Sequence, residues 1–140
     1  MKFWDASALA PLCCAQPASA QVNRLARADG TMVVWWATPV EIASALARLG
    51  REGALTAADV NATLALLGTL REAWTEVLPV DGVRERAERL LRAHSLRAAD
   101  ALQLAAALVW VADRPAGAVL VTLDDRLRTA ATQEGFTVEP

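Results

Sequence analysis

Five short apolar runs divide the chain, and most of the sequence between them has its apolar residues at helical spacing. The apolar runs, which predict strands, are Met1–Trp4, Met32–Trp36, Val77–Val80, Val119–Val121 and Phe136–Val138. The segments that predict helices are Ala18–Ala28, Pro39–Leu49, Ala57–Trp74, Val83–Ala93, Arg97–Val111 and Arg126–Glu134. Strands that alternate with helices favour a mainly parallel sheet, because each helix carries the chain back to begin the next strand. The pattern therefore predicts an α/β fold, a three-layer α/β/α sandwich around a five-stranded sheet.

The bulk composition limits the kind of protein this can be. A length of 140 residues fits one domain, which we expect to span residues 1–140 around one core. With 54% hydrophobic residues and a mean hydropathy of +0.25, the chain is rich in apolar residues, and we expect a homodimer to cover part of its surface. A net charge of −2 excludes the overall basic field of many nucleic-acid-binding proteins, so any contact with RNA must be local.

The N-terminal region bears on location. Cys13 and Cys14 are adjacent, a spacing at which a disulfide between them is unfavourable, and the sequence has no other cysteine. The uncharged stretch from Ala6 to Asn23 loosely resembles a secretory signal, but Asp5 interrupts the apolar region and Lys2 is the only positive charge before it. No apolar run approaches the roughly 20 residues that cross a bilayer. We therefore expect a cytoplasmic protein.

Three acidic side chains follow predicted strands or open the helix after one. Asp5 ends the first strand, Glu41 lies in the first turn of the helix after the second, and Asp124 follows the fourth. Parallel sheets bind ligands beyond the carboxyl ends of their strands, so acids at these positions carry more weight than acids elsewhere. The fourth candidate, Asp100, lies on a predicted helix.

Each acid also has a purely structural interpretation. Glu41 completes a possible capping box with Thr38, Asp124 or Asp125 could cap the last helix, and Asp5 could begin a turn. Asp100 is harder to explain in this way, because it heads an apolar stripe on one helix face. The rest of that stripe is Gln103, Leu104, Ala107, Leu108 and Val111. A carboxylate there costs several kcal/mol unless a cation or strong donors satisfy it.

A divalent cation explains the four acids together. Gathered without a nearby lysine, they would repel one another, and a metal ion reverses that penalty. Oxygen ligands favour a hard ion such as Mg²⁺ or Mn²⁺. His94, the one histidine, is better placed to cap a helix end than to bind a metal.

Four segments, in this order, resemble the successive motifs of PIN domains. They are Phe3-Trp4-Asp5-Ala6-Ser7-Ala8-Leu9, Pro39-Val40-Glu41-Ile42-Ala43, Arg97-Ala98-Ala99-Asp100-Ala101-Leu102-Gln103-Leu104-Ala105 and Val121-Thr122-Leu123-Asp124-Asp125-Arg126-Leu127. The resemblance spans nearly the whole chain, and its length and spacing are most similar to VapC-type toxins of bacterial VapBC toxin and antitoxin pairs.

The resemblance implies an endoribonuclease in which Asp5, Glu41, Asp100 and Asp124 hold Mg²⁺ or Mn²⁺ to hydrolyse RNA phosphodiester bonds. It also implies supporting hydroxyls at Ser7 and Thr122, a sheet order of 3-2-1-4-5, and a VapB-like antitoxin as partner. Two features depart from the family pattern. Asp125 doubles the last acid, which leaves open whether Asp124 or Asp125 coordinates, and Trp4 is bulky for its position.

Other hypotheses remain beside this one. Ser7 stands where a haloacid-dehalogenase-like phosphatase would need a second aspartate, and Lys2 cannot serve as the late lysine of a response-regulator receiver. A non-catalytic PIN-fold binding module and a PIN ribonuclease in RNA processing without an antitoxin both stay open. Arg48, seven residues after Glu41, and Arg97, three before Asp100, could bind RNA phosphates or be ordinary solvated arginines.

The predicted helix Ala57–Trp74 bears on assembly. It carries Val60, Leu64, Leu67 and Leu70 along one side, which either pairs two copies of the chain or packs within one. Gly53 to Thr56 predict a turn before this helix, with Thr56 as its N-cap.

Overall fold

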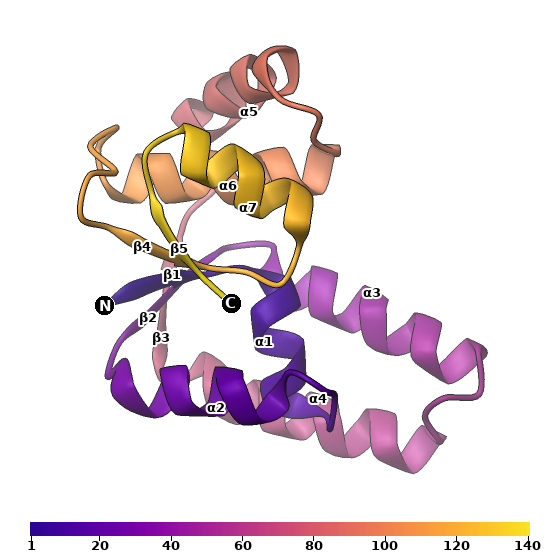
Figure 1. Cartoon of the computed structure of the whole chain (residues 1–140). Coiled ribbons are helices and arrows are strands. Elements are labelled where there is room, and N and C mark those ends of the chain that lie inside the picture. Colours follow the sequence, from indigo (N-terminus) through magenta and orange to yellow (C-terminus); the bar gives the residue numbers. More distant parts are fainter.

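A computed structural model describes residues 1–140 and contains one five-stranded parallel sheet in the order β3-β2-β1-β4-β5 (Figure 1). The strands are β1 (Lys2–Trp4), β2 (Met32–Trp35), β3 (Trp74–Val77), β4 (Val119–Val121) and β5 (Thr137–Glu139). The helices are α1 (Ala6–Cys13), α2 (Ser19–Ala28), α3 (Thr38–Arg51), α4 (Ala57–Arg71), α5 (Asp81–Ala93), α6 (Ala98–Trp110) and α7 (Asp125–Gln133). The expected fold class and strand order are both confirmed.

The helices form two layers, with α1 to α4 on one face of the sheet and α5 to α7 on the other (Figure 1). Neighbouring strand residues point to opposite faces, so each layer has its own core. Phe3 packs with α5, α6 and α7, whereas Trp4 packs with α1, α3 and α4. The same alternation buries Trp35 and leaves Trp36 exposed.

The sheet has its topological switch point between β1 and β4. From β1 the chain crosses to β2 on one side, and β4 lies on the other side of β1. The backbone N–H of Asp5 continues this pairing by donating to the carbonyl of Val121 at 3.0 Å. The residues that follow β1 and β4 therefore leave the sheet side by side, at the edge where such folds bind ligands.

Two elements differ from the sequence prediction. Helix α1 was not predicted, because Pro11 and an almost uniformly apolar sequence obscure its period; the Asp5 side chain caps it, and Leu9 and Pro11 are buried in the fold. The third strand is Trp74–Val77, so the predicted Val77–Val80 was wrong. Strand β3 is an edge strand, which tolerates the polar Thr75 and Glu76, whereas Pro79 cannot donate a backbone hydrogen bond.

The hairpin of α3 and α4 follows its predicted turn. Thr56 caps α4 by accepting from the backbone N–H of Asp59 at 3.1 Å, and Asp59 accepts from the backbone N–H of Thr56 at 2.9 Å. On the apolar side of α4, Leu67 is buried within the chain and Leu64 is exposed.

No helix combines the length and apolar character that crossing a membrane requires.

Candidate active site

Asp5 lies at the carboxyl end of β1 and is only 5% exposed. Its Oδ2 accepts hydrogen bonds from the backbone N–H of Ser7 at 3.1 Å, from the Ser7 hydroxyl, and from the Thr122 hydroxyl at 2.9 Å. Burial raises the pKa of the Asp5 carboxyl, and these hydrogen bonds oppose that rise. No side chain donates to Oδ1.

The two hydroxyls beside Asp5 are held in turn by the segment after β4. Ser7 Oγ accepts from the backbone N–H of Leu123 at 2.9 Å, and Thr122 Oγ1 accepts from that of Asp124 at 3.1 Å. The two hydroxyl oxygens are 3.2 Å apart. Ser7 and Thr122 therefore orient one oxygen of Asp5.

Glu41 lies in the first turn of α3 and is bonded to a helix of the opposite layer. Gln103 of α6 is completely buried, and its amide nitrogen donates to Glu41 Oε1 at 3.1 Å and to Thr38 Oγ1 at 3.2 Å. Burial raises the pKa of Glu41 to about 7, with the Gln103 hydrogen bond opposing the rise and the charges of Asp5 and Asp100 adding to it. Glu41 therefore sits within electrostatic range of two other predicted site acids.

The capping box that the sequence offered as an alternative role for Thr38 and Glu41 does not form. Helix α3 has Ala37 as its N-cap, with no side-chain cap, and Thr38 is already helical. Both side chains instead accept hydrogen bonds from Gln103, whose buried amide would otherwise lack acceptors. Glu41 is thereby directed into the molecule rather than back to the helix start.

Asp100 lies in the first turn of α6, where its carboxylate accepts from the backbone N–H of Arg97 at 3.2 Å. Burial raises the pKa of Asp100; the hydrogen bond from Arg97 opposes this, and the charge of Asp124 adds to it. Arg97 and Arg126 are close enough to lower the same pKa through their charges. Asp100 thus faces both the last acid of the site and two cations.

The structure separates the two adjacent aspartates at the start of α7. Asp124 caps the helix through Oδ1, which accepts from the backbone N–H groups of Arg126 and Leu127 at 2.9 and 2.8 Å. Its second oxygen takes no part in the cap. The Asp125 side chain is fully exposed and is 3.9 Å from Arg128. Asp124 is therefore both a cap and the aspartate that acts on Asp100.

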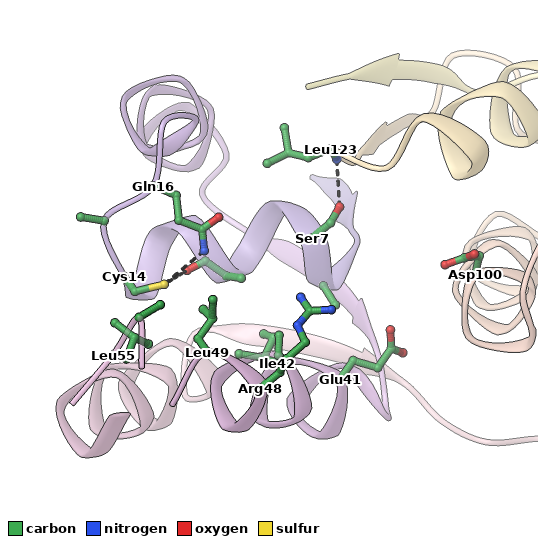
Figure 2. A pocket seen from close by; sticks show the side chains of 15 residues that line it. Ser7, Cys14, Gln16, Glu41, Ile42, Arg48, Leu49, Leu55, Asp100 and Leu123 are labelled. Carbon is green, nitrogen blue, oxygen red and sulfur yellow. Dashed lines mark hydrogen bonds between the residues drawn. The ribbon is translucent and has the colours of Figure 1, made fainter. Parts of the chain in front are cut away.

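Two adjoining cavities contain most of the predicted residues. The larger, about 630 Å³, is lined by Ser7, Glu41, Arg48 and Asp100 among mainly apolar side chains. Figure 2 shows Glu41 on α3 and Asp100 on α6 around the same opening, with Arg48 extending from α3.

The smaller cavity, about 380 Å³, is lined by Arg97, Asp100, Asp124 and Arg126, with Leu123 and Asp125. Asp100 and Leu123 line both cavities, so the two adjoin. Asp5 lines neither cavity and is connected to the larger one through Ser7.

The residues present fit a hard divalent cation in their chemistry. All four acids offer oxygen, and no lysine is near, since Lys2 pairs with Glu139. No three acidic, histidine or cysteine side chains in this structure are close enough to form a complete metal site. Burial is the main cause of the raised pKa values of Glu41 and Asp100, and the charge of another acid adds to each; a divalent cation would oppose both effects.

Sequence reasoning missed two residues of this site. Gln103 was assigned only to the apolar stripe of α6, although an amide three residues after Asp100 on that face needed a partner. Arg126 was not singled out at all. Its position beside Asp124 and Asp125 was the only signal in the sequence, and the fold turns it toward Asp100.

Comparisons with known proteins support the fold described above. The model of the PIN domain family matches residues 2–133. No curated protein shows significant sequence similarity to this chain.

Three solved structures share the fold. VapC20 of Mycobacterium tuberculosis, described as a sarcin-ricin loop cleaving toxin, is similar with a TM-score of 0.70, 18% identity and 100% coverage of both chains. FitAcB of Neisseria gonorrhoeae has a TM-score of 0.66 and 15% identity over 100% of this chain and 97% of that one. A toxin-antitoxin complex of Klebsiella pneumoniae has a TM-score of 0.63 and 14% identity over 89% and 87%.

Proposed function

Since the chain belongs to the PIN domain family, we propose that it is a metal-dependent endoribonuclease that hydrolyses RNA phosphodiester bonds. The observation that carries the proposal is the buried Asp5 at the switch point, oriented by Ser7 and Thr122. A buried carboxylate without a cationic partner is costly, and no basic side chain pairs with Asp5, so a bound cation would offset the cost that its hydrogen bonds leave. Glu41 and Asp100 open into the cavity that Ser7 lines.

In this proposal Asp5, Glu41, Asp100 and Asp124 hold Mg²⁺ or Mn²⁺. When bound, the metal lowers the pKa of a water molecule and neutralises charge on the scissile phosphate. The protein's own residues set the geometry around it. Ser7 and Thr122 fix Oδ2 of Asp5, the α7 cap fixes Oδ1 of Asp124, and Gln103 holds one oxygen of Glu41.

Arg48 and Arg97 are proposed to bind RNA phosphates beside the metal. Arg48 lines the larger cavity with Glu41, and Arg97 lines the smaller one with Asp124. Neither guanidinium forms an ion pair within the chain, whereas Arg86 and Arg89 each pair with an acid. An unpaired guanidinium next to the site is available for a phosphate.

We further propose that the chain is the toxin of a type II pair and that a VapB-like antitoxin covers the acidic cleft. The similar fold in a toxin-antitoxin complex of Klebsiella pneumoniae supports a partner of this kind. The larger cavity suits such a segment, because apolar side chains such as Ile42, Leu49 and Leu55 lie beside Glu41 and Asp100. An arginine of the antitoxin could offset the acids' charge and compete with the metal.

A PIN ribonuclease without an antitoxin would have the same site but no inhibitor, so adding the product of the neighbouring gene discriminates the two. A non-catalytic binding module is disfavoured by the four acids and by the hydrogen bonds spent on orienting Asp5.

The proposed homodimer has a better candidate surface than α4. Trp36, Val40, Leu78 and Val80 are each 49% exposed or more, near the carboxyl ends of β2 and β3. The backbone N–H of Trp36 bonds to the carbonyl of Val77 at 3.1 Å, which brings Trp36 and Leu78 together. Such a group of apolar side chains is typical of a protein interface.

We also propose a cytoplasmic location. An RNA substrate and two free cysteines, Cys13 and Cys14, both favour it.

The test of the proposal is cleavage of a labelled single-stranded RNA by the purified chain with Mg²⁺, with Mn²⁺, and with chelator. We expect internal cuts with either metal and none with chelator. Cleavage that persists in chelator, or its absence with both metals when no antitoxin is present, would contradict the proposal.

A further inference from the structure

A third cavity, of about 530 Å³, lies between the end of α5 and one side of α7. It adjoins the smaller cavity of the site, because Asp125 and Arg126 line both. Six of its eight lining residues are polar or charged, and Ala93 and Ala130 are the two apolar ones. The third cavity therefore lies next to the smaller cavity of the site, with Asp125 and Arg126 at the boundary between them.

The wall of the third cavity is held in place by a network behind it. The His94 ring lies between Gln133 Oε1 at 2.9 Å and Glu134 Oε1 at 2.7 Å. Arg89 donates to both oxygens of Glu134, at 3.0 and 2.7 Å. When both ring nitrogens of His94 carry a proton, the Gln133 amide is held through its oxygen, and its nitrogen makes no hydrogen bond within the chain. Thr129 donates its hydroxyl hydrogen to the carbonyl of Asp125 at 2.9 Å, which leaves its oxygen free to accept.

Arg126 stands between this cavity and the acids. Its backbone N–H is used by the Asp124 cap, but its guanidinium makes no hydrogen bond or ion pair within the chain. By contrast, the neighbouring Arg128 donates to the carbonyl of Thr122 at 3.0 Å. A free guanidinium at the junction of two cavities is well suited to an anion that passes from one to the other.

We infer that the third cavity is a nucleotide subsite of the RNA, in which Arg126 binds the phosphate next to the scissile one and Gln133 and Thr129 contact the base. This inference rests on the proposed ribonuclease function. A fixed amide nitrogen and a free hydroxyl oxygen offer a donor and an acceptor, the groups that read the edge of an unpaired base. An apolar protein segment would leave these polar groups without partners, so a nucleotide fits the wall better.

RNA binding provides the first test, with Asp5→Asn protein used to prevent cleavage. Fluorescence anisotropy of a labelled single-stranded RNA over a salt series compares Arg126→Ala in that background with a matched control, Arg114→Ala. Arg114 is exposed in the loop before β4, at the amino end of that strand, whereas the site lies beyond the carboxyl ends of the strands. We expect Arg126→Ala to weaken binding roughly tenfold and to reduce the slope of log K against log salt by about 0.7, the value for one phosphate contact on a single strand.

Base preference provides the second test. Sequencing the cut ends of a randomised RNA should show that Gln133→Ala and Thr129→Val each alter the preference at one position beside the cut, at unchanged metal affinity. An unchanged preference in both variants, or equal RNA binding by Arg126→Ala and Arg114→Ala, overturns the subsite and leaves the ribonuclease standing. If the Asp5→Asn parent binds no RNA and the native chain cuts none, the proposed function fails, and the subsite fails with it.

Discussion

The hydroxyl of Thr122 donates to Oδ2 of Asp5 at 2.9 Å, across 117 residues of sequence. The contact forms because β1 and β4 are neighbours in the sheet, so the residues that follow them emerge together. Ser7 bonds to the same oxygen and to the backbone after Thr122. The most buried acid of the site is therefore oriented by two segments from opposite ends of the chain.

Replacing Asp5 or Asp100 by asparagine should abolish metal-dependent RNA cleavage while preserving the fold. We expect a loss of at least about 100-fold, because each change removes an anionic metal ligand. The metal-free Asp5→Asn protein should melt at the same temperature as the native chain or higher, since burial disfavours the charge of Asp5. Circular dichroism and cleavage at matched metal concentration check both points. The control is Asp81→Asn, because the Asp81 side chain is 84% exposed. Native cleavage activity in either site variant would refute the role of that aspartate as a metal ligand.

Removing the hydroxyls that hold Asp5 should lower activity without removing any metal ligand. We expect Ser7→Ala and Thr122→Val each to reduce cleavage about 10- to 100-fold, as is typical when the partners of metal ligands are lost. Each should also cost about 1 kcal/mol of unfolding free energy. Thr75→Val, at an exposed position of β3, serves as the matched control in cleavage assays and denaturant titrations. If both site variants behave like this control, the hydroxyls have no positioning role.

Metal binding should depend on pH through Glu41. Because the pKa of Glu41 is raised to about 7, protons compete with the metal below that pH, and binding at pH 6 should be weaker than at pH 8 and should release a proton. Calorimetry in buffers of different ionisation enthalpy measures that release, which Glu41→Gln should reduce. Equal proton release by the native chain and Glu41→Gln would exclude Glu41 as its source.

The stability of the metal-free protein should change with pH in the corresponding direction. A folded-state pKa above the unfolded value of 4.5 means that Glu41 contributes stability fully below pH 4.5 and loses that contribution as pH rises toward 7. Thermal melts in chelator should therefore show a greater fall between pH 5 and pH 8 for the native chain than for Glu41→Gln. Parallel curves for the two proteins would contradict this linkage.

Arg48→Ala and Arg97→Ala should weaken RNA binding and make it less dependent on salt. Each guanidinium lines a cavity of the site, and losing one phosphate contact should reduce the salt slope by about 0.7. Binding to Asp5→Asn protein by anisotropy avoids interference from cleavage. Arg51→Ala, from the last turn of α3, is the control. If RNA affinity and its salt dependence are unchanged in both variants, Arg48 and Arg97 are ordinary solvated arginines.

A charge in the exposed apolar group should dissociate the proposed homodimer. We expect Trp36→Glu to halve the mass measured by light scattering while the circular dichroism spectrum is retained, because Trp36 is 49% exposed and lies outside the core. Leu64→Glu tests the alternative surface on α4. If Leu64→Glu alone dissociates the dimer, the interface lies on α4 instead. If the native chain is itself a monomer, the proposed homodimer is wrong.

Much of the fold was predictable from the sequence, because alternating apolar runs and helical periods are local signals. The strand order agrees with the one that the PIN resemblance implied. Local signals failed at β3, where pairing with β2 outweighed the apolar character of Leu78 and Val80, and at α1, where burial of Leu9 and Pro11 compensates for a proline. They also failed at Thr38, which has a capping sequence but accepts a hydrogen bond from α6 instead.

The sequence by itself determined most of the elements, the acids near their ends and the family, since these depend on residue types and their spacing. Only the tertiary structure decided which groups meet. The approach of α6 to α3 pairs Gln103 with Glu41, and the pairing of β1 with β4 joins Thr122 to Asp5. Asp124 faces Asp100 while Asp125 points into solvent, although the two residues are adjacent. The physical reason is that hydrogen bonds and charge effects act over a few ångströms, and only packing brings distant residues within that range.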